Sequence, residues 1–363
     1  MDVEFLGMGA PNAHSELLDR TGPALDPAYL TRVVRAHEEA GWDHVLFAYS
    51  SGSPDPAQCA LFAATVTETI KIRLAHRPNA SHPTAAARTF ASLDALSGGR
   101  LTVHVITGGS TADQAREGDH VTKDERYDRT AEWMSVVMRA LTQTEPFSHE
   151  GRYYRFDDFA LQVRPVSSPR PLFSFGGSPP AAYRVGAAQA DVFALFGEPL
   201  DSTRQQIASI EAAAAAAGRE RPRLQIAFRP IIAPTDAQAW AKAEDLLRRI
   251  TDVAEQRRLA AALAGRAAEP VENAGAQRLI EVAQQQERWD RALWTPTVTA
   301  AGNYGSVTAL VGSPETVAAA LLDYADLGFE IFGLRGYDFI ADAEEFGREV
   351  IPLVRAEAAR RSG

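Results

Sequence analysis

Short apolar runs alternate with longer amphipathic segments along most of this chain of 363 residues. An apolar run bounded by turn residues is typical of a buried strand, and apolar positions that repeat every three or four residues are typical of a helix. The expected strands span residues 3–8, 44–48, 70–75, 101–106, 172–175, 192–195, 223–232 and 330–334. The expected helices span residues 26–40, 57–66, 83–96, 123–141, 181–188, 202–217, 236–251, 314–327 and 341 to about 360.

Eight strands separated by helices predict an α/β fold of the (β/α)₈ or TIM-barrel type, in which parallel strands are covered by helices outside. An open, doubly wound sheet is the alternative. No segment resembles a flexible linker, so residues 1–363 are expected to form one domain.

Two insertions interrupt the repeating pattern, one after the fourth strand and one after the seventh. Residues 146–165 predict a hairpin with strands at 153–156 and 159–163. Residues 252–305 are rich in Ala, Gln and Arg and predict helix or loop without a clean strand. Their last part, residues 291–305, contains Gly302 and Gly305 among small residues and is a candidate lid.

Composition excludes several classes of protein. Hydrophobic residues make up 45% and charged residues 23%, as in ordinary globular proteins. The net charge is −10 and no long basic run occurs, which argues against nucleic acid or an anionic membrane as partner. The single cysteine, Cys59, excludes an intramolecular disulfide and a cysteine-rich metal site, and we expect it to be a buried, inert thiol. With no signal peptide and no apolar run of membrane-spanning length, we expect a cytoplasmic protein.

Glycine pairs at the ends of two expected strands form a candidate phosphate-binding site. Thr107-Gly108-Gly109-Ser110 and Gly176-Gly177-Ser178 offer backbone N–H groups and hydroxyls to a phosphate, and Arg126-Tyr127 opens the helix after the first of them. Two ordinary turns are the alternative. Gly7-Met8-Gly9 follows a strand but lacks the third glycine of a dinucleotide site. No hydrolase elbow, phosphate-binding loop for nucleotides or zinc motif occurs, and no metal is expected.

Several short motifs follow one another in a specific order and spacing. They are Arg77-Pro78, His82-Pro83-Thr84, Leu96-Ser97-Gly98-Gly99-Arg100, Val105-Ile106-Thr107-Gly108, Glu125-Arg126-Tyr127, Phe175-Gly176-Gly177-Ser178, Gly197-Glu198-Pro199, Thr308-Ala309-Leu310-Val311-Gly312 and Gly336-Tyr337. Together they resemble the bacterial luciferase-like superfamily of flavin-dependent monooxygenases, and within it the alkanesulfonate monooxygenase group. The resemblance covers nearly the whole chain.

The resemblance implies a (β/α)₈ barrel that takes reduced FMN from a separate NAD(P)H-dependent flavin reductase and uses O₂. The expected reaction is the oxygenation of a small, anionic organosulfur or related heteroatom compound. A homodimer or homotetramer is implied as well. Two other functions stay open: a deazaflavin-dependent oxidoreductase, and a non-catalytic flavin-binding accessory protein.

The resemblance also implies where the flavin lies. Leu74-Ala75-His76 falls where the superfamily has a non-prolyl cis peptide under the flavin ring, so Ala75 and His76 are candidate cofactor contacts. His104 stands where relatives often have asparagine, facing the flavin pyrimidine, and its imidazole is able to donate or accept a hydrogen bond and to titrate. The alternative is a satisfied histidine of the barrel interior.

The substrate side departs from the sulfonate pattern. Sulfonate-oxidising relatives have an arginine and a histidine on the seventh strand and an arginine on a loop before the eighth, and here these positions are Ala227, Arg229 and about Asn303. Tyr337 matches the family, and Arg335 precedes it by two positions. Arg229 and Arg335 either form a rearranged anion clamp or hold structural carboxylates. Tyr337 and His14 are candidates for moving protons, as is His104.

Overall fold

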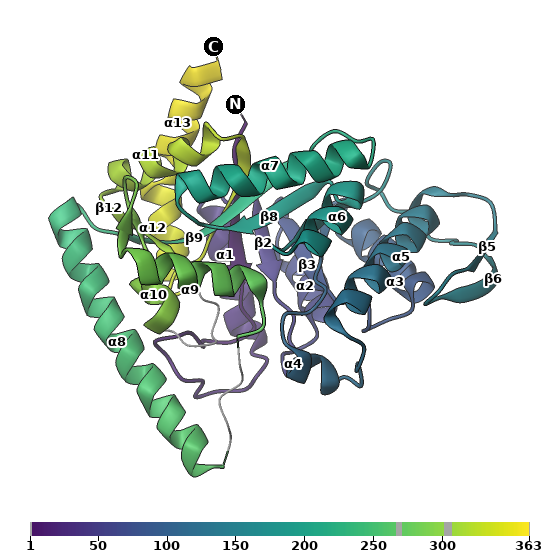
Figure 1. Ribbon diagram of the computed structural model, residues 1–363, viewed down its shortest axis with the longest axis horizontal. Coiled ribbons are helices and arrows are strands. Elements are labelled where there is room, and N and C mark those ends of the chain that lie inside the picture. The colour runs from purple at the N-terminus through teal and green to yellow at the C-terminus, as the bar shows by residue number, and fades with distance from the viewer. Residues whose placement is uncertain (1, 266–270, 301–306, 363) are drawn as a thin grey trace. The chain divides into compact units, whose positions relative to one another are not determined.

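The computed structural model describes residues 2–265, 271–300 and 307–362. The chain divides into two compact units, the first made of residues 1–44, 195–208 and 224–363 and the second of residues 45–194 and 209–223. Parallel strands alternate with helices in both units, as the sequence predicts (Figure 1). In the described part of the chain, no helix is long and apolar enough to cross a membrane.

The first unit holds strands in the order β10-β11-β12-β9-β13-β1. The strands are β1 (Glu4–Gly9), β9 (Arg223–Ile232), β10 (Arg288–Trp289), β11 (Leu293–Trp294), β12 (Ala309–Gly312) and β13 (Phe329–Leu334). β1, β13, β9 and β12 are parallel neighbours, whereas β10 and β11 pair antiparallel. The helices are α1 (Pro27–Glu39), α8 (Asp236–Leu263), α9 (Ala274–Gln285), α10 (Pro296–Ala300), α11 (Pro314–Ala325), α12 (Ala341–Glu349) and α13 (Ile351–Ser362).

Local chemistry fixes the start of this unit. The Asp26 side chain accepts hydrogen bonds from the backbone N–H groups of Ala28 and Tyr29, at 3.0 and 3.1 Å, and so caps α1. Gly7 on β1 allows α1 to approach closely, because a Cβ there would lie 2.1 Å from the His37 ring. The cap therefore sets where α1 begins, and the small residue sets how closely α1 packs on the strand.

Residues 252–305 contain more regular structure than the sequence predicts. Helix α8 continues to Leu263, and β10 and β11 form a short antiparallel pair in a region for which no strand is predicted. β12 is also an unpredicted strand. Strands of two to four residues show no measurable period, which explains the omission. Gly302 and Gly305 of the candidate lid lie outside the described residues.

The second unit holds strands in the order β2-β3-β4-β7-β8 and a separate hairpin of β5 and β6. The strands are β2 (His44–Phe47), β3 (Lys71–His76), β4 (Leu101–Val105), β5 (Phe147–Glu150), β6 (Arg155–Phe159), β7 (Leu172–Gly176) and β8 (Val192–Phe196). The helices are α2 (Pro56–Val66), α3 (Pro83–Leu96), α4 (Thr111–Ala115), α5 (Lys123–Thr142) and α6 (Pro180–Gln189). Helix α7 (Leu200–Ala216) begins in the first unit and ends in the second.

The hairpin exists, but its strands are not the predicted ones. The β-like residues Tyr153 and Tyr154 lie in the turn between β5 and β6, and residues 160–163 form no strand. Glu132 on α5 holds this turn, since its carboxylate accepts hydrogen bonds from the backbone N–H groups of Tyr153 and Tyr154 at 3.0 and 2.9 Å. A tertiary contact thus overrides local strand propensity.

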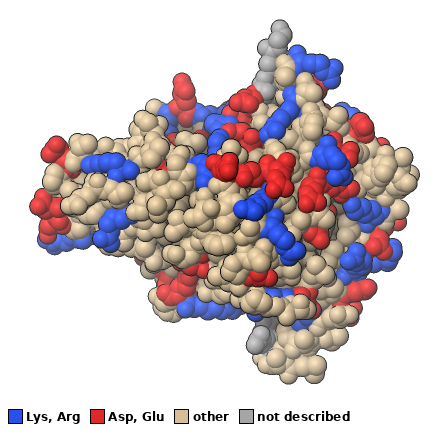
Figure 2. Space-filling view, turned by 180° about the vertical axis from the view of Figure 1, so that it is seen from behind, with Lys and Arg blue, Asp and Glu red and all other residues tan. Residues whose placement is uncertain are grey.

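Charges on the surface are mixed rather than segregated. Figure 2 shows Lys and Arg interspersed with Asp and Glu over one face of the molecule. The net charge of −10 therefore does not gather into one acidic area on that face.

Candidate functional site

A row of side chains in the second unit contains the predicted cofactor residue His104. In-register pairing places Ala75, His104 and Ser174 side by side on β3, β4 and β7. Such partners point to the same face of a parallel sheet. His104 Nδ1 and Ser174 Oγ are 2.7 Å apart. Sequence reasoning missed Ser174, although strand pairing alone would have identified it as a neighbour of His104.

His76 does not share this face. Because side chains alternate along a strand, His76 points to the opposite side from Ala75. Its ring stacks on Trp133, with 5.2 Å between ring centroids, and its Nε2 lies 3.1 Å from Ser81 Oγ. The structure therefore separates two residues that the resemblance placed together, and His76 has a packing role behind the sheet.

The expected cis peptide is also absent. Among the described residues, the cis peptide bond is the one between Ser168 and Pro169, so the Ala75–His76 bond is trans. Both residues pair regularly with β4, Ala75 with His104 and His76 with Val105. A trans bond is the lower-energy form for a non-prolyl residue in such a strand.

Burial decides the charge of both histidines. Burial lowers the pKa of His104 to about 3, and the nearby Arg73 lowers it further. Burial likewise lowers the pKa of His76 to about 4. Both rings are therefore neutral at physiological pH. Desolvation disfavours the imidazolium, so a neutral His104 suits a hydrogen bond rather than a proton transfer.

Arg126 and Tyr127 lie in the first turns of α5, as predicted. A capping box of Thr122 and Glu125 fixes the start of this helix. Arg126 is only 1% exposed, and its Nη1 donates to the carbonyl oxygen of Val121 at 3.1 Å. Its Nε and Nη2 have no hydrogen-bond partner. A buried guanidinium with unpaired donors is costly unless it holds an anion.

Gly177 lies next to Tyr127. Its φ is +146°, and a Cβ built on it would lie 2.8 Å from Ala182 Cβ and 3.6 Å from the Tyr127 hydroxyl oxygen. The Thr107 hydroxyl is buried without a partner. The backbone at Gly177 thus lies close to a phenol at a position where only glycine fits, and backbone N–H groups next to a hydroxyl suit a phosphate cradle. Ser178 follows Gly177 directly and is half-buried.

Packing explains two further glycines of these motifs, Gly176 and Gly108. A Cβ on Gly176 would lie 2.9 Å from the backbone oxygen of Ala194 on the next strand. Gly108 has φ +95°, and a Cβ there would overlap Gln114 Nε2 at 1.6 Å. Gln114 itself is fully buried with both side-chain amide atoms unpaired. Sequence reasoning missed it, since nothing in its local motif marks it.

Loops at the ends of β2 and β3 are tied to α4 by a charged network. The Arg77 guanidinium pairs with Asp113 and with Glu117, the latter at 3.2 Å, and lies 4.7 Å above the ring of Tyr49. Tyr49 donates to Glu117 at 2.7 Å. The motif residue Arg77 therefore positions loops.

The first unit brings together Arg229 on β9 and Arg335 after β13, and both contact one carboxylate. Glu16, on the loop between β1 and α1, accepts a hydrogen bond from Arg229 at 2.6 Å and also pairs with Arg335. Glu16 and Arg229 are each 3% exposed. Burial alone would raise the pKa of Glu16, but the two guanidinium groups outweigh it and hold the pKa below its usual range. We call Glu16, Arg229, Arg335 and Tyr337 the Glu16 cluster.

Tyr337 completes this cluster, and His14 lies near it. The Arg229 guanidinium carbon is 4.3 Å from the centroid of the Tyr337 ring. Burial raises the pKa of Tyr337, so its hydroxyl stays protonated at neutral pH. Burial and Arg257 lower the pKa of His14, against the opposite effect of Glu16. Asn303, the expected position of the loop arginine, lies outside the described residues.

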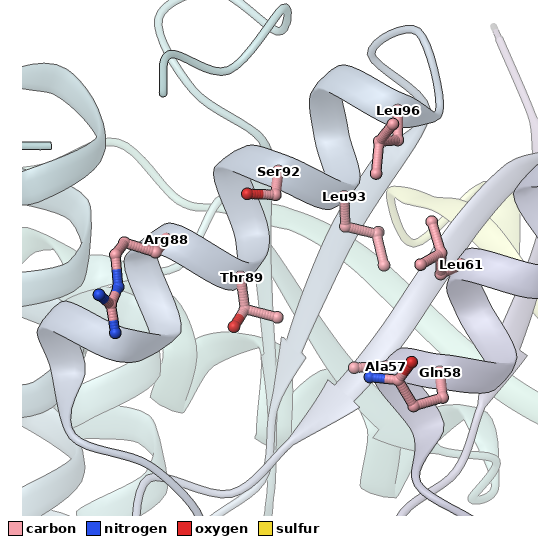
Figure 3. Close-up of a pocket in the computed structure, with 8 residues that line it drawn as sticks. All are labelled: Ala57, Gln58, Leu61, Arg88, Thr89, Ser92, Leu93 and Leu96. Carbon is pink, nitrogen blue, oxygen red and sulfur yellow. The ribbon is translucent and has the colours of Figure 1, made fainter. Parts of the chain in front are cut away.

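A surface groove lies apart from these residues. It is enclosed by α2 and α3 and has a volume of about 280 Å³ (Figure 3). Apolar side chains such as Leu61, Leu93 and Leu96 point toward it from the two helices. None of the predicted site residues lines this groove.

The family follows from comparison with known sequences. The sequence pattern of the luciferase-like monooxygenases matches residues 6–330. The chain therefore belongs to the luciferase-like monooxygenase family, which confirms the predicted superfamily; the subgroup is not defined by this match.

Similar solved structures support the fold. Riboflavin lyase RcaE, determined with modified FMN and riboflavin, aligns with a TM-score of 0.80 and 21% identity over 99% of this chain and 92% of that one. EDTA monooxygenase EmoA from Chelativorans sp. BNC1 aligns with a TM-score of 0.77 and 19% identity, over 99% and 95%. An F420-dependent secondary alcohol dehydrogenase aligns with a TM-score of 0.71 and 16% identity, over 98% and 100%. This likeness confirms the predicted α/β fold with a closed barrel of eight parallel strands.

Proposed function

We propose that this protein is a monooxygenase that binds reduced FMN, supplied by a separate flavin reductase, and uses O₂ to oxygenate a small anionic substrate. The substrate class we favour is organosulfur or related heteroatom compounds. One observation carries the proposal: a guanidinium that is 1% exposed, Arg126, keeps two unpaired nitrogens at the start of α5. Family membership supports it.

The residues of the second unit fit FMN. Arg126, Tyr127 and Thr107 would hold the phosphate, with the backbone around Gly177 and Ser178 adding N–H donors. His104, neutral and paired with Ser174, would offer a hydrogen bond to the isoalloxazine. Reduced FMN supplies the electrons that activate O₂. The protein contributes binding, orientation and the exclusion of water.

The Glu16 cluster would hold the substrate. Arg229 and Arg335 bind an anionic group through charge-assisted hydrogen bonds. The Tyr337 hydroxyl, protonated at neutral pH, donates a hydrogen bond or a proton. His14, with its lowered pKa, is unprotonated at neutral pH and accepts one.

Oxygen uptake tests the proposal directly. The protein is mixed with photoreduced FMN and a panel of sulfonates, sulfones and heterocycles, and O₂ consumption and product are followed together. Substrate-dependent product that contains oxygen from O₂ is the expected result. Flavin that binds but gives no product with any compound would instead favour a non-catalytic flavin-binding protein.

A deazaflavin-dependent oxidoreductase is the second candidate. The likeness to the F420-dependent alcohol dehydrogenase favours it. Binding of reduced FMN and of F420 is therefore compared by titration, and alcohol substrates are tested without O₂. Reduction of F420 by an alcohol under anaerobic conditions would replace the monooxygenase proposal.

Replacement of Arg229 tests the substrate side. Arg229→Ala removes a charge-assisted hydrogen bond in a buried site, so we expect kcat/KM on the identified substrate to fall about tenfold or more. Arg229→Lys should recover only part of the activity, because an ammonium lacks the planar fork. FMN affinity should not change. Equal activity of Arg229→Ala and wild type would make Arg229 structural.

A further inference from the structure

The Glu16 carboxylate is shared unevenly by its two arginines. A single oxygen, Oε1, accepts hydrogen bonds from Nη2 of both Arg229 and Arg335. Nη1 of Arg229, Nε of Arg335 and the Tyr337 hydroxyl have no hydrogen-bond partner of standard geometry, although all are buried. The second oxygen of Glu16, Oε2, is also buried without a partner. The pairing with Glu16 therefore leaves three donors and one carboxylate oxygen of the cluster unused.

Unused donors of this kind indicate a ligand rather than a purely structural ion pair. A buried donor without an acceptor costs about 1–3 kcal/mol, and more for a charged group. A structural carboxylate would stabilise the fold most by accepting from both guanidinium forks through both oxygens. Here Oε2 accepts from none of these donors, so a second acceptor group is needed to satisfy the remaining nitrogens and the phenol.

The charge of the cluster limits what that acceptor group is. Burial, with repulsion from Arg229, lowers the pKa of Arg335 to about 10, so Arg335 remains protonated at neutral pH. Glu16 remains ionised, since its pKa is lowered. Two guanidinium groups and one carboxylate leave one net positive charge in a site that is buried at Glu16 and Arg229, while the Arg335 side chain is 26% exposed. Unbalanced charge in such a site is strongly disfavoured.

We propose that Glu16 sets the ligand charge of this cluster, so that it selects an organic acid with one negative charge over one with two. One negative charge neutralises the cluster, whereas a second would lie unbalanced beside the Glu16 carboxylate. Glu16 is thus a specificity-determining residue that acts through the two arginines. The inference rests on the proposed function in assigning Arg229 and Arg335 to the substrate.

Two isosteric anions test the proposal. Benzenesulfonate carries one charge and phenylphosphonate carries two at sufficiently high pH, and both present a tetrahedral group of three oxygens on a phenyl ring. Their dissociation constants are measured by calorimetry at that pH and constant ionic strength, with the full-length protein and without flavin. Wild type should bind the sulfonate about tenfold more tightly or better, as expected for one uncompensated buried charge.

The variant Glu16→Gln keeps the shape and removes the charge. It should shift the preference toward the phosphonate by about tenfold or more, because the cluster then carries two positive charges. Asp19→Asn is the matched control: it neutralises an exposed carboxylate on the same loop, paired with Arg257, and should keep the wild-type ratio. Arg335→Gln should abolish sulfonate binding.

Three results would overturn the inference. They are equal binding of both anions by wild type, no binding of either anion by wild type, and an unchanged ratio in folded Glu16→Gln. If Glu16→Gln does not fold, the ratio of the two dissociation constants in wild type and the loss of sulfonate binding in Arg335→Gln still test the proposal. Because flavin and O₂ are absent, a failure here is distinct from failure of the oxygen-uptake experiment.

Discussion

Gly177 is the residue at which conformation and binding are most closely linked. Its φ is positive, and a Cβ at this position would lie only 2.8 Å from Ala182 Cβ, which leaves no room for a side chain. We expect Gly177→Ala to weaken reduced-FMN binding about tenfold or more in a fluorescence titration, because it strains the backbone that would contact the phosphate.

Gly118 provides the matched control. Its φ is +77°, and a Cβ there would meet nothing within 4 Å. Gly118→Ala should therefore cost about 1–2 kcal/mol of stability through backbone strain alone and leave FMN affinity unchanged. If Gly177→Ala and Gly118→Ala lose the same FMN affinity, Gly177 is not part of the proposed phosphate site.

Buried histidines should make the protein sensitive to mild acid. Burial lowers the pKa of His37 and of His76 to about 4, from the usual 6.5. Between these values the unfolded chain binds protons that the folded chain does not, so the free energy of unfolding falls as the pH falls below 6.5. Each histidine contributes about 1.4 kcal/mol per pH unit. The stability that they provide is fully present above pH 6.5.

Urea unfolding at a series of pH values between about 6.5 and 5.5 measures this effect above most of the range where carboxylates titrate. His76→Phe keeps an aromatic ring beside Trp133 and should reduce the slope by about one proton. If the free energy of unfolding depends on pH with the same slope in wild type and in His76→Phe, His76 does not cause the loss of stability in acid.

The sequence identifies only some residues of the Glu16 cluster. Arg229, Arg335 and Tyr337 could be found from their places after expected strands, but Glu16 could not. It lies 213 positions from Arg229 on a loop without a motif. Only the folded chain brings that carboxylate to the two guanidinium groups.

Among the elements, the turn of the hairpin of β5 and β6 donates two backbone hydrogen bonds to one side chain of α5. Glu132 accepts two backbone N–H groups from the turn and lies 3.0 Å from His149 Nε2. Burial alone would raise the pKa of Glu132, but these hydrogen bonds hold it below its usual range. Glu132→Ala should speed hydrogen exchange at Tyr153 and Tyr154 about tenfold or more, since both donors lose their acceptor.

The control for this experiment lies on the hairpin itself. Glu150 forms an exposed ion pair with Arg155 at 3.4 Å, and such pairs contribute little. Exchange at the turn should be the same in Glu150→Ala as in wild type. If Glu132→Ala also leaves exchange unchanged, the turn is held by other contacts.

Elements were predictable where hydrophobic period and caps agree. Helix α1 begins after Asp26 as predicted, and each of the eight expected strands has a counterpart in the structure. The last part of α8, residues 252–263, was predicted only as helix or loop, because its last turns expose Leu259 and Leu263 instead of packing an apolar face. The final helix is divided at Val350 into α12 and α13, a break that apolar periodicity does not reveal.

At the scale of the whole molecule, we expect a homodimer or homotetramer formed through the early helices, since closed symmetric dimers are the commonest assembly. Light scattering at micromolar concentration measures the mass. Leu96 on α3 is 69% exposed beside the groove of Figure 3. Leu96→Glu should lower the mass to that of a monomer, because a charge in a closed interface is unfavourable.

Leu263→Glu is the control for assembly, since it places the same charge on an exposed leucine at the end of α8. It should keep the wild-type mass. A wild-type particle of monomer mass would contradict the expected assembly outright.

The solitary thiol of α2 has a practical consequence for spectroscopy. Cys59 is 4% exposed, and burial raises its pKa, so little reactive thiolate is available to reagents. The wild-type protein should therefore react very little with maleimide dyes and thiol-directed nitroxide spin labels. A cysteine introduced at Leu263, which is 90% exposed, would carry one probe at one known place. Its fluorescence anisotropy or spin-label mobility would then report the motion of α8 while anions or flavin are added, with no native cysteine to remove first.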